Sequence, residues 1–140
     1  MLRSGIIHHE LAGLIAGLRH TDTFVISDAG LPLPPGIPTV DLGYRYGQPP
    51  FLDVTEALLA QVVVEHSWVT DQVRAVNPTV FAALRSLGLE PEPLDHEEFK
   101  ARVAHAGFAV RTGEDTFFAN VLCRAGVPFT PCPARFCPSS

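Results

Sequence analysis

Segments with helical periodicity alternate with short apolar segments along most of this chain. Residues 8–19 carry leucine and isoleucine at i, i+3, i+4 and i+7, which predicts a helix with one apolar face. Residues 23–27 (TFVIS) are β-branched and aromatic, which favours a strand. Further helices are expected over residues 50–61, 71–76, 78–87 and from 96 onward, and further strands over residues 39–42, 62–68, 109–112 and 118–122. This alternation predicts an α/β fold layered around one sheet.

The length and composition agree with a single globular domain. The chain has 140 residues, of which 46% are hydrophobic and 18% are charged, enough to bury one core of ordinary size. We expect the domain to span residues 1–130. The Pro- and Cys-containing residues 131–140 read as a flexible tail.

Charge and hydropathy argue against two kinds of partner, nucleic acid and the membrane. The net charge is −5 and no basic cluster is present, so the chain lacks the electrostatic signature of a protein that binds nucleic acid. No apolar run approaches the ~20 residues that span a bilayer, and His8, His9 and Glu10 interrupt the N-terminal apolar residues. We therefore expect a cytoplasmic protein without membrane contact.

Neither a metal nor a cofactor is predicted. The three cysteines are an odd number, and Cys132 and Cys137 lack the second pair of ligands that a structural zinc site needs, so free thiols are expected. The glycine-rich motifs that bind dinucleotides or nucleoside triphosphates are absent.

Titratable residues flank the strand predicted over residues 23–27. His20 could act as an acid or a base near neutral pH, or could only cap the preceding helix. Asp22 could orient His20 or only cap the turn into the strand. Asp28 could accept hydrogen bonds from sugar hydroxyls at the carboxyl end of the strand, or could form an Asx turn. The prolines that follow predict a stiff loop that forms one wall of a pocket.

A second histidine lies at a predicted helix start. Asp95 and Glu98 have the spacing of a capping box, which puts His96 in the first helical turn. His96 could both donate and accept hydrogen bonds there, or could be a solvated surface residue.

Three stretches of this sequence resemble one protein family. HTDTFVISDAGLPLP, DHEEFK and RTGEDTFFAN followed by VLCRAGVPF resemble, in the same order, the D-ribose pyranase branch of the family that also contains L-fucose mutarotase. The first stretch is specific for this branch of the family, and the other two are moderately specific for it. The likeness extends from Gly5 to about Phe129.

This resemblance implies a single-domain layered α/β fold with a mixed sheet flanked by helices. It also implies a cofactor-free isomerase that interconverts pyranose and furanose forms of D-ribose or a related pentose, in a ring-shaped, decamer-like homo-oligomer with sites between subunits. By position, His20 matches the catalytic histidine, and in this interpretation Asp22 orients it. The positions that match sugar-binding residues are Asp28, His96, Phe118, Ala119 and Asn120. Phe118 departs from the family, which has tyrosine there.

Other functions stay open at this point. A sugar-binding module would keep Asp28 and Asn120 without catalysing exchange. A related scaffold used for another acid–base isomerisation or cyclisation would keep His20, and Phe118 would suit a less hydroxylated ligand. A metal hydrolase built on His20, Asp22 and Asp28 is a weaker alternative, because this spacing is a poor ligand pattern.

Overall fold

A six-stranded sheet forms the centre of the computed structural model, which describes residues 1–130. The strands are β1 (Thr23–Ser27), β2 (Thr39–Asp41), β3 (Val64–Thr70), β4 (Glu92–Leu94), β5 (Phe108–Arg111) and β6 (Val121–Ala125). The helices are α1 (His9–Ala16), α2 (Phe51–Leu59), α3 (Val73–Val76), α4 (Pro78–Ser86) and α5 (His96–Val103). The expected tail, residues 131–140, lies outside the described residues.

The sheet is mixed, as the resemblance implies, and its order is β2-β5-β1-β6-β3-β4. β1 and β2 run parallel to β5, and β4 runs parallel to β3. Among the described strands, β6 alone is antiparallel to its neighbours, β1 and β3. The other five strands therefore end at the same edge of the sheet.

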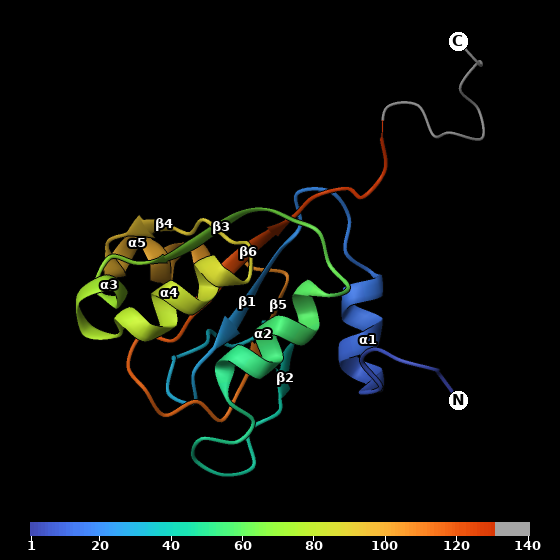
Figure 1. Cartoon of the computed structure of the whole chain (residues 1–140), viewed down its shortest axis with the longest axis horizontal. Helices are drawn as coiled ribbons and strands as arrows, with labels where there is room; N and C mark the ends of the chain where they lie inside the picture. The colour runs from blue at the N-terminus through green and yellow to red at the C-terminus, as the bar shows by residue number, and fades with distance from the viewer. Residues whose placement is uncertain (131–140) are drawn as a thin grey trace.

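Apolar side chains cover both faces of the sheet. On one face, the core joins α1, α2, α3 and α4 to the strands through fully buried residues such as Phe51, Leu58 and Leu84. On the other face, Phe99 and Val103 of α5 pack on the sheet together with the Pro-rich loop that follows β1. Figure 1 looks onto the first face, with α2 and α4 in front of the strands. The fold is thus the predicted layered α/β arrangement.

The strand expected over residues 118–122 is wrong at its start. Phe118 has a φ of +60°, which a strand does not accommodate, and the Asn120 N–H donates to the Phe118 carbonyl at 2.8 Å. β6 begins only at Val121. The three residues 118–120 therefore lie in the loop that leads into β6.

Two further differences concern β3 and β4. The Val62 N–H donates to the Leu58 carbonyl at 2.9 Å, so this residue completes the last turn of α2 and β3 starts two residues later than expected. The strand β4 was not predicted, because Pro93 and the exposed Glu92 are untypical of a strand. β4 is short and lies at the edge of the sheet, where a proline is tolerated.

Cys123 is fully buried in β6. Burial raises the pKa of Cys123 to about 12, so its thiol stays protonated at neutral pH. No helix within residues 1–130 has the length and apolar character that crossing a membrane requires.

Candidate active site

A pocket of about 470 Å³ lies at the edge where the parallel strands end. Asp28 follows β1, His96 follows β4, and residues 114–118 follow β5. Tyr46 reaches the pocket from the loop after β2, and Asn120 precedes β6. Segments that are far apart in the sequence therefore meet here, at the edge where α/β proteins usually bind ligands.

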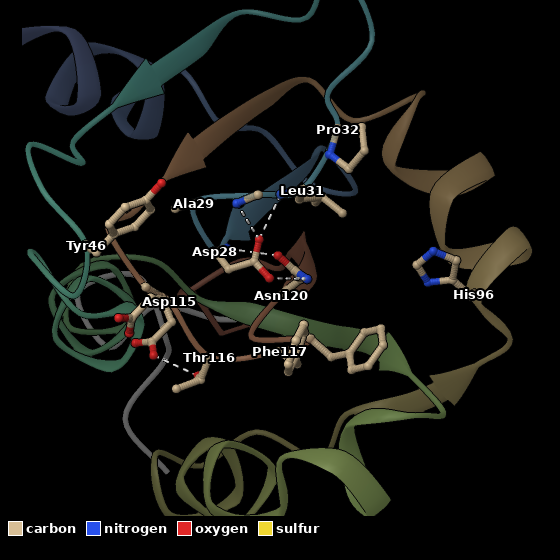
Figure 2. Close-up of a pocket in the computed structure, with 13 residues that line it drawn as sticks. Asp28, Ala29, Leu31, Pro32, Tyr46, His96, Asp115, Thr116, Phe117 and Asn120 are labelled. Carbon is tan, nitrogen blue, oxygen red and sulfur yellow. Dashed lines mark hydrogen bonds between the residues drawn. The ribbon is translucent and has the colours of Figure 1, made fainter.

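Asp28 and Asn120 form a bonded pair at the centre of the pocket (Figure 2). The Asn120 side-chain amide donates to Oδ2 of Asp28 at 3.3 Å, and the Asp28 backbone N–H donates to Oδ1 of Asn120 at 2.8 Å. Oδ1 of Asp28 accepts from the N–H groups of Gly30 and Leu31 at 2.9 and 2.8 Å. Asp28 thus forms the Asx turn that the sequence left open, and it also lines the pocket.

Burial is the largest influence on the Asp28 carboxyl and raises its pKa above the usual 3.8. The negative charge of Glu114 acts in the same direction, whereas the hydrogen bonds from Gly30, Leu31 and Asn120 oppose it. The carboxyl group is therefore a partly desolvated acceptor, which suits a hydroxyl donor from a ligand.

His96 lies across the pocket from Tyr46, with the Asp28–Asn120 pair between them (Figure 2). Asp95 caps α5 as predicted, because its carboxylate accepts from the Glu98 N–H at 2.9 Å, and this places His96 at the first helical residue. Nδ1 of His96 is buried and has no hydrogen-bond partner among the described residues. His96 is therefore not a freely solvated surface residue: this ring nitrogen is shielded from water, and the residue lines the pocket.

Phe118 and Ala119 contribute differently to the site. Phe118 lines the pocket and packs edge-on against the His96 ring, with 6.1 Å between ring centroids. Ala119 is fully buried in the core and is not among the pocket-lining residues.

Glu114 holds the pocket loops together. One of its carboxylate oxygens accepts from the Phe51 N–H at 2.9 Å and the other accepts from the Thr116 hydroxyl at 2.7 Å. Its backbone carbonyl accepts from the Ala29 N–H at 2.9 Å. These contacts join the loop after β5 to α2 and to the loop after β1.

His20 lies at the opposite edge of the sheet, where β1 begins. Its Nε2 is 2.9 Å from Oε2 of Glu65, and its side chain is 55% exposed. The alternative that His20 caps α1 is wrong, because the Arg19 guanidinium donates to the Ala16 carbonyl at the end of this helix at 3.2 Å, and to the Leu18 carbonyl just beyond it at 2.9 Å. His20 also lines a separate cavity of about 650 Å³ whose other lining residues are mostly apolar.

Asp22 has a partner other than His20. Its Oδ2 accepts from the Arg19 N–H at 2.8 Å, and its own N–H donates to the Arg19 carbonyl at 3.0 Å. Asp22 therefore closes the turn that carries His20, which is the capping alternative, and any influence on His20 acts through the backbone.

The predicted site residues thus form two groups. Asp28, His96, Phe118 and Asn120 come together in the pocket, whereas His20 and Asp22 lie at the other end of β1. Because a strand rises about 3.3 Å per residue, the five residues of β1 separate the two groups by roughly 17 Å.

Sequence reasoning missed three polar residues near these groups. Tyr46 lies in a loop without a recognisable motif, and Glu114 lies within RTGEDTFFAN, where only the resemblance and no local chemical pattern marks the stretch. Glu65 could have been noticed, because VVVEHSW places a carboxylate and an imidazole inside an otherwise apolar stretch.

A pocket lined by a carboxylate, an amide and an imidazole has the acceptors and donors that a small hydroxylated molecule would need. The sequence model of the RbsD / FucU transport protein family matches residues 1–128, and the chain belongs to this family.

Similar proteins cover the chain almost completely. D-ribose pyranase 1 of Rubrobacter xylanophilus is 46% identical over 92% of this chain and its own full length. D-ribose pyranase 2 of Streptomyces griseus is 45% identical with the same coverage. The structure of Bacillus subtilis RbsD complexed with D-ribose matches with a TM-score of 0.88 and 40% identity, over 92% of this chain and all of that chain. The fucose mutarotase of Streptococcus pneumoniae, 18% identical with a TM-score of 0.77, shares the fold.

Proposed function

We propose that this protein is a mutarotase that interconverts the pyranose and furanose forms of D-ribose. The observation that carries this proposal is the full-length match to the Bacillus subtilis protein that is complexed with D-ribose. The pocket agrees with it, because Asp28, His96 and Asn120 offer acceptors and donors for sugar hydroxyls among otherwise largely apolar lining residues.

Interconversion of the two ring forms needs proton transfer and no redox step. The anomeric hydroxyl loses its proton as the bond from C1 to the ring oxygen breaks, and the ring oxygen gains a proton. The open aldehyde then closes with a different hydroxyl. A positioned histidine can move these protons, and such groups typically contribute ~10²–10⁴-fold to a rate. His20 is the proposed proton carrier.

The separation of His20 from Asp28 leads us to propose a composite site, in which one copy of the chain contributes His20 and another contributes Asp28. Since β1 holds these residues at opposite edges of one sheet, a single copy cannot apply both to one sugar. A second copy can supply His20 to the pocket of the first. The closed ring assembly that the family resemblance implies would provide such contacts.

Exposed apolar side chains near both groups support this assembly. Phe129 and Val63, which line the cavity beside His20, are 70% and 42% exposed. Tyr46 and Phe117, which line the Asp28 pocket, are 83% and 75% exposed. Apolar surface of this kind marks interaction sites, and contact between copies would cover it.

NMR exchange spectroscopy on D-ribose tests the proposed activity. We expect the wild-type protein to accelerate exchange between pyranose and furanose signals and His20→Ala to abolish this acceleration with the fold intact. His9→Ala, which removes another exposed histidine, is the matched control and should retain exchange. Ribose binding without exchange would favour a sugar-binding module, and no binding would favour a scaffold used for another ligand. The cytoplasm remains the proposed location, which cell fractionation would test.

A further inference from the structure

Glu65 and Arg124 surround the exposed His20 imidazole. Oε2 of Glu65 lies 2.9 Å from Nε2 of His20, and Oε1 accepts from Nε of Arg124 at 2.8 Å. The Arg124 guanidinium in turn lies over the Trp68 ring, 5.6 Å from its centroid. Arg124, which packs on the buried Trp68 ring, therefore holds the carboxylate that faces His20.

The backbone of β3 directs Glu65 toward His20. Val64 pairs with Ala125 and His66 pairs with Arg124, so Glu65 is an extra residue in a β-bulge. Bulges re-aim a side chain and are frequent beside active sites. Gly126 leaves room for the Glu65 side chain, since a Cβ at position 126 would lie only 3.1 Å from the Cβ of Glu65.

The turn before β1 brings His20 to the same place. Thr21 has a φ of +74°, which is uncommon for a residue other than glycine, and its N–H donates to the Ala125 carbonyl at 2.9 Å. Asp22 closes this turn through its two bonds to Arg19. The contact between His20 and Glu65 is therefore formed by two irregular backbone segments, the turn at Thr21 and the bulge at Glu65.

The charge of Glu65 determines where His20 carries its proton. The hydrogen bond from His20 is the largest cause that lowers the pKa of Glu65 below the usual 4.5, and the bond from Arg124 acts in the same direction. An ionised carboxylate can only accept hydrogen bonds, so Nε2 of a neutral His20 must carry the proton. Nδ1 is then the unprotonated nitrogen.

We propose that Glu65 is the positioning residue of this mutarotase and that Nδ1 of His20 is the atom that exchanges the proton. Nδ1 takes the proton of the anomeric hydroxyl while the C1–ring oxygen bond breaks and the carbonyl forms. The imidazolium, stabilised by Glu65, returns that proton to the ring oxygen. The catalytic part of this inference rests on the proposed function, whereas the position of the proton on His20 in the free protein does not.

Nitrogen-15 NMR of histidine-labelled protein tests the pairing directly. We expect neutral His20 in the wild type to show a protonated Nε2 and a free Nδ1, with its signals assigned by their loss in His20→Ala. Glu65→Ala should give a mixture of the two tautomers. Glu92→Ala is the matched control, because it removes a similar contact, 2.7 Å between Oε2 of Glu92 and Nε2 of His66, and should leave the His20 signals unchanged.

Ribose exchange kinetics test the catalytic role. Glu65→Ala should lower kcat by about tenfold to hundredfold, less than the whole acid–base contribution, with KM changed less than about threefold. Glu65→Gln, which keeps the side-chain shape if the alanine variant fails to fold, should lower kcat by a smaller factor. Glu92→Ala should keep the wild-type kcat.

A wild-type His20 protonated at Nδ1, or a wild-type kcat in both Glu65 variants, would overturn this inference. A wild type without ribose exchange would overturn the proposed function instead. The tautomer measurement would then still decide whether Glu65 positions His20.

Discussion

Phe118 lies where the resemblance to the ribose pyranase family implies a tyrosine. Its ring lines the pocket against His96 but has no hydroxyl to offer a sugar. One missing hydrogen bond typically costs ~0.5–1.5 kcal/mol of binding free energy. We therefore expect Phe118→Tyr to tighten D-ribose binding by roughly threefold to tenfold, measured by calorimetric titration. Weaker binding of ribose by the tyrosine variant would show that the pocket is shaped for an apolar contact.

The raised pKa of Asp28 predicts a pH-dependent stability. Because folding raises this pKa above 3.8, the folded protein binds the proton more tightly than the unfolded chain does. The resulting stabilisation is complete below pH 3.8 and is lost as the pH rises through the raised pKa. Asp28→Asn cannot titrate.

The difference in free energy of unfolding, wild type minus Asp28→Asn, should therefore fall between about pH 4 and pH 7. Urea denaturation of both proteins across this range measures it, and taking the difference cancels the titrating groups that do not interact with Asp28. A difference that rises with pH would show that hydrogen bonding outweighs burial at this carboxyl group.

At the residue scale, the sequence could identify side chains but not their partners. Asp28 and Asn120 are 92 positions apart, and only the pairing of β1 with β6 makes them a bonded pair. The partner of His20 was expected to be Asp22, two positions away, whereas the contact is made by Glu65, 45 positions away. Sequence reasoning proposes partners that are close along the chain, whereas the fold brings together partners that are far apart along it.

At the scale of elements, Gly113 joins the loops after β2 and β5. A Cβ there would lie 2.7 Å from the Arg45 carbonyl oxygen and nearer still to that of Gln48. Gly113→Ala should therefore destabilise the protein by about 1–3 kcal/mol and weaken ribose binding, because both loops line the pocket. Thermal unfolding and titration of ribose check this expectation.

Gly13→Ala is the control for this substitution. A Cβ at position 13 meets nothing within 4 Å, and the residue lies inside α1. Alanine should stabilise the helix there by about 0.5–1 kcal/mol. If Gly113→Ala and Gly13→Ala changed the free energy of unfolding equally, the close contact between the loops after β2 and β5 would be contradicted.

Strand and helix prediction succeeded where hydrophobic pattern and burial agree. Residues 23–27 form β1 as expected, because this strand lies in the middle of the sheet and four of its five residues are buried. The error at residues 118–122 arose because the apolar Phe118 and Ala119 resemble a strand. Their neighbour Asn120 instead bonds to Asp28, and this contact outweighs local propensity.

At the scale of the whole molecule, a composite site predicts complementation between inactive variants. His20→Ala and Asp28→Ala should each be inactive alone. In an assembly that mixes them equally, about a quarter of the sites combine an intact His20 with an intact Asp28 from different copies. Coexpression followed by NMR exchange should therefore recover about a quarter of the wild-type activity.

Light scattering provides the control for the complementation experiment. Each variant and the mixture should have the mass of an oligomer well above the 15.1 kDa of one chain. An inactive mixture with this mass, or a monomer, would contradict the composite site.

The position of β6 in the sheet determines when the protein can fold. Without it, the sheet divides into β2-β5-β1 on one side and β3-β4 on the other, because β6 pairs with both β1 and β3. It is also the last of the described strands along the chain. A ribosome must therefore synthesise the chain through Ala125 before the two halves can join, and such long-range pairing slows folding. Until then the nascent chain leaves unpaired the edges of β1 and β3 that β6 will cover, and unpaired strand edges favour aggregation.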